Sequence, residues 1–190
     1  MMRAGAGLLA LALISCSPPD EPAKAEIPPS APVSVQQAGC RATTSHDWSA
    51  VGSQYYVVEA ELGGPTCAEA RATIRIKSTS GEVLFEHSYD VAQVPLAFAP
   101  NSDQTARRNE LEEWAQNAAD TPTANSLPAW PGGAARPPNF RPVVNRQTYE
   151  GARGTEGPIF CFPDGGESNA CVFMNGQRAT LLGSLTPESE

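Results

Sequence analysis

The sequence predicts a small, disulfide-stapled α+β domain of antiparallel strands with one main helix, over residues 38–190 of the 190-residue chain. Three observations predict it. Short runs of residues alternate between apolar and polar and are separated by turn residues, one longer run repeats at the helical period, and four cysteines lie in the same part of the chain. No internal repeat divides these residues, which are enough to bury a core of ordinary size.

The first predicted elements are strands. Residues 55–62 are rich in β-branched and aromatic side chains and end at the glycines and proline of 63–65, which is typical of a strand followed by a turn. Residues 71–90 hold two alternating runs around a Ser-Gly turn, so they are predicted to form an antiparallel hairpin. His87 shares a strand face with apolar residues and is interpreted as a hydrogen-bonded structural histidine.

One helix is predicted over residues 102–119, where side chains recur at spacings of three and four. Leu111 and Trp114 are expected to face the core, and the polar residues before the helix can cap its first turn. The solvent face of this helix is expected to carry three acids, Glu110, Glu112 and Glu113.

The strongest local turn signal lies near the C-terminus. Asn175-Gly176 separates two strand-like runs, 172–174 and 178–182, and this dipeptide is favoured in two-residue type I′ hairpin turns. Together with residues 159–162, the two runs are predicted to form a three-stranded antiparallel meander.

The N-terminus has the pattern of an export signal. Arg3 precedes an uncharged run over residues 4–14, which is too short to span a bilayer because that takes about 20 apolar residues. The next residues, Leu13-Ile14-Ser15-Cys16, resemble the lipobox of bacterial lipoproteins. This resemblance covers only residues 1–16, and the alternative is an ordinary export signal with a chance cysteine. It implies that residues 1–15 are a signal peptide and that Cys16 becomes the lipidated N-terminus.

The resemblance also implies a location. A lipid on Cys16 would attach the protein to a membrane, and Ser17 in place of an aspartate favours the outer membrane, facing the periplasm. Residues 16–37 contain six prolines among small and polar residues, which favours an extended chain without a packed core. We therefore interpret residues 16–37 as the lipidated cysteine followed by a tether.

Five cysteines are present, and lipidation would use Cys16. The remaining four are an even set, which predicts disulfides in an oxidising compartment. Cys161 and Cys171 lie in neighbouring strand-like runs and are therefore paired, which leaves Cys40 and Cys67 for the second bridge. A metal site or a reactive thiol is the alternative, but metal-ligand spacing is absent because no two cysteines lie within four residues and only two histidines occur.

Composition and motifs argue against several functions. The net charge is −8, and it becomes −9 once Arg3 is removed with the signal peptide, which disfavours nonspecific binding of nucleic acid. No G-x-S-x-G motif, phosphate-binding loop or dinucleotide fingerprint occurs. His46 and Asp47 are adjacent, so on an extended chain their side chains point apart and form no part of a catalytic triad. We therefore predict that the protein is not an enzyme and uses no metal or cofactor.

Residues 127–155 differ in charge from the rest of the chain, because they hold four arginines against Glu150 alone. Arginine with aromatic neighbours is typical of interface anchors, and long loops inside compact domains often bind a partner. The alternative is that this segment wraps the sheet and that its arginines pair with the acidic body. The candidate partner-binding residues are Trp130, Arg136, Phe140, Arg141, Arg146, Tyr149 and Arg153.

Two functions from different classes remain. The first is a non-enzymatic binding or structural role in the cell envelope, with an envelope protein or a wall or lipid component as partner. The second is inhibition of a secreted hydrolase such as lysozyme, which is a basic protein whereas this chain is acidic. This second hypothesis rests on compartment and size alone. Mixing the purified protein with lysozyme and following wall lysis separates the two.

Overall fold

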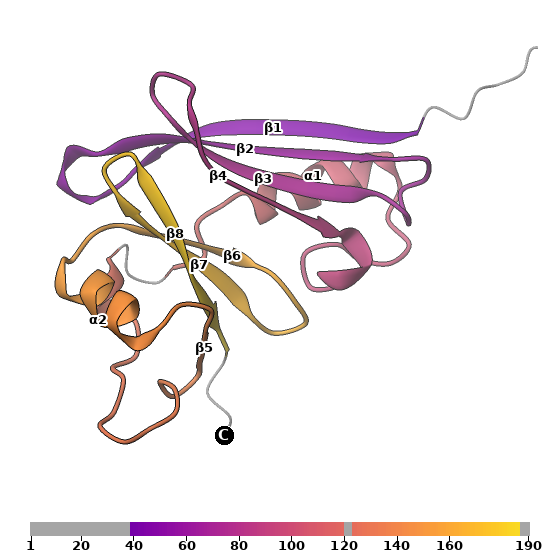
Figure 1. Ribbon diagram of the computed structural model, residues 1–190. Helices are drawn as coiled ribbons and strands as arrows, with labels where there is room; N and C mark the ends of the chain where they lie inside the picture. The colour runs from indigo at the N-terminus through magenta and orange to yellow at the C-terminus, as the bar shows by residue number, and fades with distance from the viewer. Residues whose placement is uncertain (1–38, 120–122, 187–190) are drawn as a thin grey trace, which may run out of the picture. The chain divides into compact units, whose positions relative to one another are not determined.

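The structure, a computed structural model, describes residues 39–119 and 123–186. Within them the chain forms two four-stranded antiparallel sheets and two α-helices (Figure 1). The α+β prediction holds in this coarse form, although the described part is mostly β. Its helices have 11 and 9 residues, so one main helix does not stand out, and neither is long and apolar enough to cross a membrane. The predicted signal peptide, Cys16 and the Pro-rich tether lie outside the described residues.

The first sheet follows the order of the chain. Its strands are β1 (Cys40–Ser49), β2 (Tyr55–Gly64), β3 (Arg71–Ser78) and β4 (Val83–Asp90). The predicted hairpin over residues 71–90 is confirmed, since β3 and β4 pair along it. Its inner face is apolar because alternate residues point to the same side, as buried Ile74 and Ile76 do.

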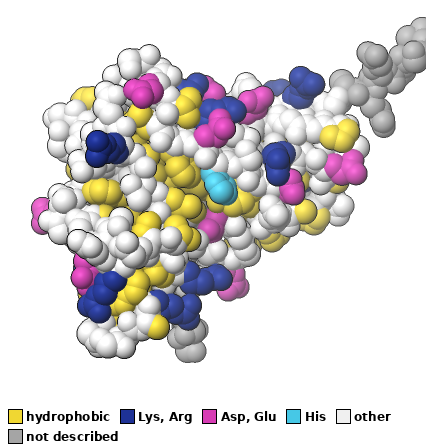
Figure 2. Space-filling view, viewed as in Figure 1, with side chains coloured by type: hydrophobic (Ala, Val, Ile, Leu, Met, Phe, Trp, Pro, Cys, Tyr) yellow, Lys and Arg dark blue, Asp and Glu magenta, His cyan; other side chains and the backbone are white. Residues whose placement is uncertain are grey.

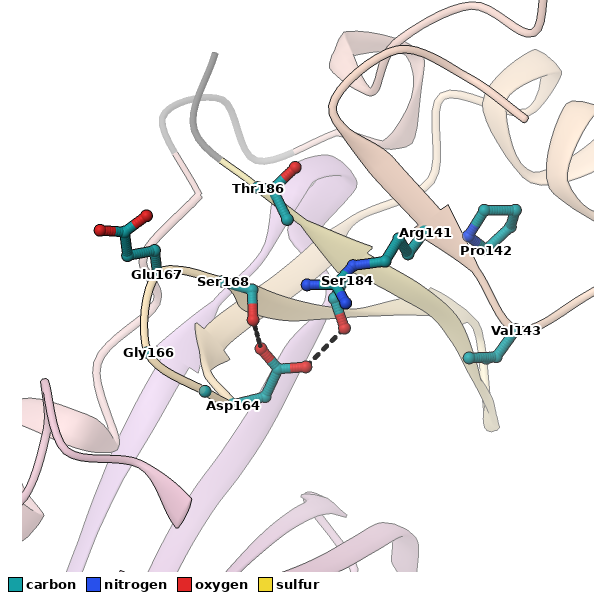
Figure 3. A pocket seen from close by; sticks show the side chains of 10 residues that line it. Arg141, Pro142, Val143, Asp164, Gly166, Glu167, Ser168, Ser184 and Thr186 are labelled. Carbon is teal, nitrogen blue, oxygen red and sulfur yellow. Dashed lines mark hydrogen bonds between the residues drawn. The ribbon is translucent and has the colours of Figure 1, made fainter. Parts of the chain in front are cut away.

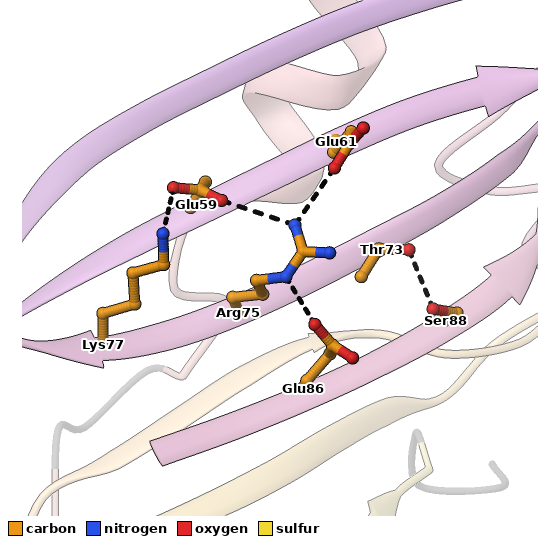
Figure 4. A network of polar contacts seen from close by, with 7 residues as sticks. All are labelled: Glu59, Glu61, Thr73, Arg75, Lys77, Glu86 and Ser88. Atoms are coloured by element: carbon orange, nitrogen blue, oxygen red, sulfur yellow. Dashed lines mark hydrogen bonds and ion pairs between the residues drawn. The ribbon is translucent and has the colours of Figure 1, made fainter. Parts of the chain in front are cut away.

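The outer face of this sheet carries a network of charges around Arg75 (Figure 4). The Arg75 guanidinium donates to Glu86 at 2.5 Å, to Glu61 at 3.1 Å and to Glu59 at 3.4 Å, and Lys77 donates to Glu59 at 2.5 Å. The pKa of the Glu59 carboxyl is lowered, and the hydrogen bond from Lys77 makes the largest contribution to this shift. The acids of this face are therefore largely paired within the sheet.

Helix α1 (Gln104–Trp114) is shorter than predicted. Asp103 caps it by accepting the backbone N–H groups of Thr105 and Ala106, both at 2.9 Å. The helix ends early because the following residues bond to the second sheet, as the Ala118 N–H does to the Cys161 carbonyl at 2.7 Å.

The predicted inner face of α1 is confirmed, but its predicted outer face is partly wrong. Leu111 and Trp114 are buried, as expected. Glu110 does not lie on the solvent face: its side chain is 17% exposed and pairs with the buried Arg107 at 2.7 Å. The Glu110 carboxylate turns inward because it can bond to the buried Arg107 guanidinium and to a nearby turn. Helical periodicity alone does not predict this position.

The second sheet has the order β5-β8-β7-β6. Its strands are β5 (Phe140–Pro142), β6 (Ile159–Pro163), β7 (Asn169–Asn175) and β8 (Arg178–Leu185). The predicted meander of β6, β7 and β8 is confirmed, and β5 adds an edge strand that the sequence did not predict.

The turn between β7 and β8 lies one residue further along the chain than predicted. Asn175 pairs with Arg178, so the two turn residues are Gly176 and Gln177. Only Gly176, with φ of 59°, has a positive φ. Type I′ requires a positive φ at both positions, whereas glycine at the first position alone is typical of type II′. The prediction of a type I′ turn on Asn175-Gly176 is therefore wrong in register and type.

The second sheet has apolar contacts on both faces. On one face Phe160 and Phe162 join the core of the first sheet, where Phe160 meets Trp48 with ring centroids 5.0 Å apart. On the other face lies a second core with residues of helix α2 (Arg146–Gly154), including the buried Tyr149. The second sheet therefore lies between the first sheet and α2 (Figure 1).

Both predicted disulfides are confirmed. Cys40 at the start of β1 is linked to Cys67 in the turn between β2 and β3. Cys161 and Cys171 stand directly opposite each other on β6 and β7 and are linked across the two strands. Each bridge closes a loop of the chain and so limits the unfolded ensemble.

Candidate functional site

An open hollow of about 660 Å³ lies between β5, the end of β8 and the loop that joins β6 to β7 (Figure 3). It combines charges of both signs with hydroxyl groups. The residues that line it are Arg141, Pro142, Val143, Asp164, Gly165, Gly166, Glu167, Ser168, Ser184 and Thr186.

Asp164 is held in place from both sides. Its Oδ1 accepts the Ser168 hydroxyl at 2.7 Å and its Oδ2 accepts the Ser184 hydroxyl at 2.5 Å (Figure 3). The loop is closed by the Asp164 N–H, which donates to the Ser168 carbonyl at 3.0 Å. The preceding residue, Pro163, accepts the indole N–H of buried Trp114 at 2.7 Å. The carboxylate is therefore fixed by hydroxyl groups of the loop and of β8, and the backbone just before it is bonded to α1.

The negative charge of Asp164 also reaches the first sheet. Burial raises the pKa of Tyr89 on β4, and the Asp164 carboxylate is the second cause of that rise. Tyr89 packs edge to face against Trp114, with centroids 6.1 Å apart.

Arg141 stands on β5 directly opposite Ser184 of β8. Residues opposite each other in an antiparallel pair lie side by side, and Figure 3 shows the guanidinium beside Ser184. The Arg141 side chain makes no hydrogen bond and no ion pair within 4 Å to any residue in the described ranges, Asp164 included. The hollow therefore offers a guanidinium with free donors on one side and a fixed carboxylate on the other.

The close approach of β5 to β8 depends on Gly183. Its φ is 146°, in the region that favours glycine, and a Cβ at this position would lie 2.1 Å from the Arg141 carbonyl oxygen. Backbone bonds hold the short strand on both sides of this contact, from Val143 N to Leu182 O at 2.9 Å and from Thr186 N to Asn139 O at 2.8 Å.

Arg146 and Trp130, two other predicted partner-binding residues, bond to the backbone of their own segment, Trp130 by donating to the Ala134 carbonyl at 2.9 Å. Arg146 donates to the carbonyl oxygens of Trp130 at 3.1 Å and Pro131 at 3.4 Å, and its guanidinium lies 5.8 Å from the centre of the Trp130 ring. It also pairs with Glu150 at 2.9 Å. Arg146 therefore fixes the chain around Trp130 and has few donors left for a partner.

Three further residues of the predicted set lie in or over the second core. Tyr149 is buried, donates to the Pro128 carbonyl at 2.8 Å and packs against buried Phe140, with ring centroids 5.0 Å apart. Arg153 donates to the Leu127 carbonyl at 2.8 Å. Arg136 is exposed and makes no side-chain contact of this kind in the described part of the chain. Of the seven predicted residues, only Arg141 lines the hollow.

Tyr149 gives a testable pH dependence, because burial raises the pKa of its phenol to about 12. A group whose pKa is higher in the folded state contributes stability below its unfolded pKa, near 10, and loses it as the pH rises through the folded value. We expect the free energy of unfolding to fall between pH 10 and 12, and to fall less in Tyr149→Phe. Urea unfolding across this range measures it, with Tyr55→Phe as the exposed control. Equal slopes for Tyr149→Phe and the wild type would contradict the assignment.

Neither histidine contacts the hollow. His46 lies on β1, where burial lowers its pKa, and its neighbour Asp47 points to the opposite side, as predicted. His87 is exposed between Phe85 and Tyr89, with ring centroids 6.4 and 4.6 Å away. It makes no hydrogen bond to the described residues, so the interpretation as a hydrogen-bonded histidine is wrong. The aromatic neighbours, and not a polar partner, hold its ring.

Comparison with known protein families, curated proteins and solved structures finds no match to this chain. Among residues 39–119 and 123–186, no three His, Cys, Asp or Glu side chains gather as metal ligands would. The function therefore has to be argued from the geometry of the hollow and from the pattern of the first sixteen residues.

Proposed function

We propose that this protein is a lipid-anchored lipoprotein of the cell envelope whose domain binds an anionic group of a wall or lipid component and catalyses no reaction. The observation that carries the proposal is Arg141. It is an exposed arginine with no hydrogen-bond or ion-pair partner among residues 39–119 and 123–186, on a strand that Gly183 fixes, at the rim of a hollow lined with hydroxyl groups.

The chemistry of arginine indicates the kind of ligand. Its planar guanidinium binds carboxylates and phosphates through two parallel hydrogen bonds. Wall peptides carry carboxylates and lipid headgroups carry phosphates, so the envelope supplies both. The lipobox-like residues 13–16 support this compartment, with the outer membrane facing the periplasm as the proposed location.

The hollow favours binding over catalysis. A nucleophilic serine needs a base that takes its proton and a third group that orients the base. Here both serine hydroxyls donate to Asp164, and no histidine lines the hollow. The arrangement fixes charges in place without activating a nucleophile.

The alternative role as an inhibitor of a basic hydrolase receives less support. Such a partner would need acids free to pair with it. On the first sheet Glu59, Glu61 and Glu86 already pair with Arg75 or Lys77. On the face shown in Figure 2, acidic side chains lie among basic and neutral ones and form no continuous patch.

Arg141→Gln tests the binding proposal. A hydrogen bond to a charged group contributes about 1.5–3 kcal/mol, so the Kd for an anionic ligand should rise about tenfold or more. The melting temperature should stay nearly unchanged, because the Arg141 side chain makes no hydrogen bond or ion pair to the part of the chain that the structure describes. Co-sedimentation with isolated wall sacculi, and separately with phosphatidylglycerol vesicles, measures binding and distinguishes the two sources of anion.

Arg136→Gln is the matched control, because Arg136 is also exposed and lies in the same segment but outside the hollow. It should bind like the wild type. If both variants lose binding equally, attraction is nonspecific, and if neither loses any, the hollow is not the binding site.

Cys16→Ser tests the anchor. Without the thiol no lipid can be attached, so the variant should move from the detergent fraction to the soluble periplasm or remain uncleaved. Cell fractionation followed by mass measurement of the N-terminal peptide detects either result. A processed variant that still fractionates with the membranes would overturn the lipoprotein proposal.

A further inference from the structure

We infer that the group bound in the hollow is a zwitterion, namely an amino-carboxylate whose carboxylate contacts Arg141 and whose ammonium contacts Asp164. This inference rests on the proposed function, because it names the ligand class of the same site. Figure 3 shows both charged groups among the lining side chains, with Ser184 beside them.

Asp164 has acceptor capacity that the protein does not use. An ionised carboxylate can accept about four hydrogen bonds, two at each oxygen. The serine hydroxyls occupy one position on Oδ1 and one on Oδ2. Two positions therefore remain for hydrogen-bond donors, and an ammonium group, with three N–H donors, suits them.

Arg141 and Asp164 are separated by a space and do not form an ion pair. No nitrogen of Arg141 lies within 4 Å of an Asp164 oxygen, although both residues are adjacent to Ser184, one by strand pairing and the other by its hydrogen bond. An α-amino acid carries its ammonium and its carboxylate on the same carbon atom and can bridge such a gap. Each charge then meets its opposite, which neither an isolated anion nor an isolated cation achieves.

The remaining charge in the hollow disfavours simple anions. Glu167 also lines it, so two carboxylates oppose one guanidinium. A phosphate would gain Arg141 but would also be repelled by Asp164 and Glu167, because like charges at short range raise the energy. A ligand that carries an ammonium beside its own carboxylate is instead attracted to Asp164 and Glu167. The open form of the hollow leaves room for the side chain of such an amino acid, and for a peptide attached through that side chain, to extend into solvent.

Four small probes and the mature protein in neutral detergent test the inference. Alanine is the zwitterion, N-acetylalanine keeps only the carboxylate, alaninamide keeps only the ammonium, and inorganic phosphate is the simple anion. Titrations followed by NMR on the backbone amides of Ser168 and Ser184 report binding at the hollow. We expect alanine to bind at least tenfold more tightly than each of the other probes. This comparison needs no variant and so does not depend on the folding of one.

Variants then assign the two charges. Arg141→Gln should weaken alanine and N-acetylalanine alike, while Asp164→Asn should remove the preference for alanine over N-acetylalanine. If N-acetylalanine or phosphate binds as tightly as alanine and depends on Arg141, the zwitterion is wrong and anion binding stands. If alaninamide binds as tightly as alanine, or if no probe, sacculus or vesicle binds, both this inference and the proposed function are wrong.

Discussion

Replacing Gly183 by alanine is expected to lower the free energy of unfolding by about 3 kcal/mol or more and to abolish binding at the hollow. Backbone conformations that L residues rarely adopt cost about 1–3 kcal/mol each. At this position the new Cβ would also lie 2.1 Å from the Arg141 carbonyl and 2.7 Å from the Pro142 Cα. Both are backbone atoms, so β5 must move away from β8 and takes Arg141 with it.

Gly166→Ala is the matched control for this prediction. Gly166 also lines the hollow, but nothing lies within 4 Å of a Cβ placed there and its φ is not positive. Its effect on stability should stay within about 0.5 kcal/mol, as for other surface substitutions. Urea unfolding gives the stability, and the probe titrations give binding. A Gly183→Ala protein with wild-type stability and binding would show that β5 does not depend on this contact.

The elements that the sequence predicted are those with strong local patterns. Strand β3 of the hairpin alternates between buried and more exposed residues, and the meander of β6, β7 and β8 has a two-residue turn with a glycine. Pairing Cys161 with Cys171 needed only that two neighbouring strands be antiparallel. In these cases residues close in sequence determine the structure, so the spacing of residues and the turn chemistry are sufficient to predict the element.

Two of the elements that the sequence missed, β5 and α2, depend on distant contacts; strand β1, which pairs with its neighbour β2, was also not predicted. Strand β5 has three residues and ends in proline, so its own pattern is too weak to identify a strand. Helix α2 contains Gly151 and Gly154, which lower helix propensity, and it is stabilised by burial of Tyr149. One signal was available: Asn145 caps α2 by accepting the Thr148 N–H at 2.9 Å.

The candidate site shows the same division. Arg141 belonged to the predicted set because four arginines gather in one segment, but nothing local separates it from Arg146 or Arg153. Asp164 and Ser184 were not predicted, because they meet only through the register of the second sheet. Gly183, a glycine within β8, was the one sequence signal that another strand approaches the β8 backbone closely.

Replacing Arg107 by methionine is expected to lower the free energy of unfolding by about 3–5 kcal/mol, the range for removing one partner of a buried ion pair. Arg107 is 1% exposed and pairs with Glu110 at 2.7 Å. It also donates to the Cys67 carbonyl at 3.2 Å, so it joins α1 to the turn that holds the first disulfide. Methionine would fill much of the same space but leave both acceptors without this donor.

A second substitution separates loss of the charge pair from loss of packing. In Arg107→Met with Glu110→Gln, the side chain at 110 is neutral yet can still accept from the Ala99 N–H, which bonds to Glu110 at 3.2 Å. We expect this double variant to recover more than half of the lost stability, because the cost of the single change comes mainly from a partly buried carboxylate left without its cation. Arg108→Met, on the exposed face of the same helix, should have little effect. Urea unfolding of the wild type, Arg107→Met, Glu110→Gln and the double variant measures the coupling. A double variant no more stable than Arg107→Met would mean that packing and the Cys67 contact dominate.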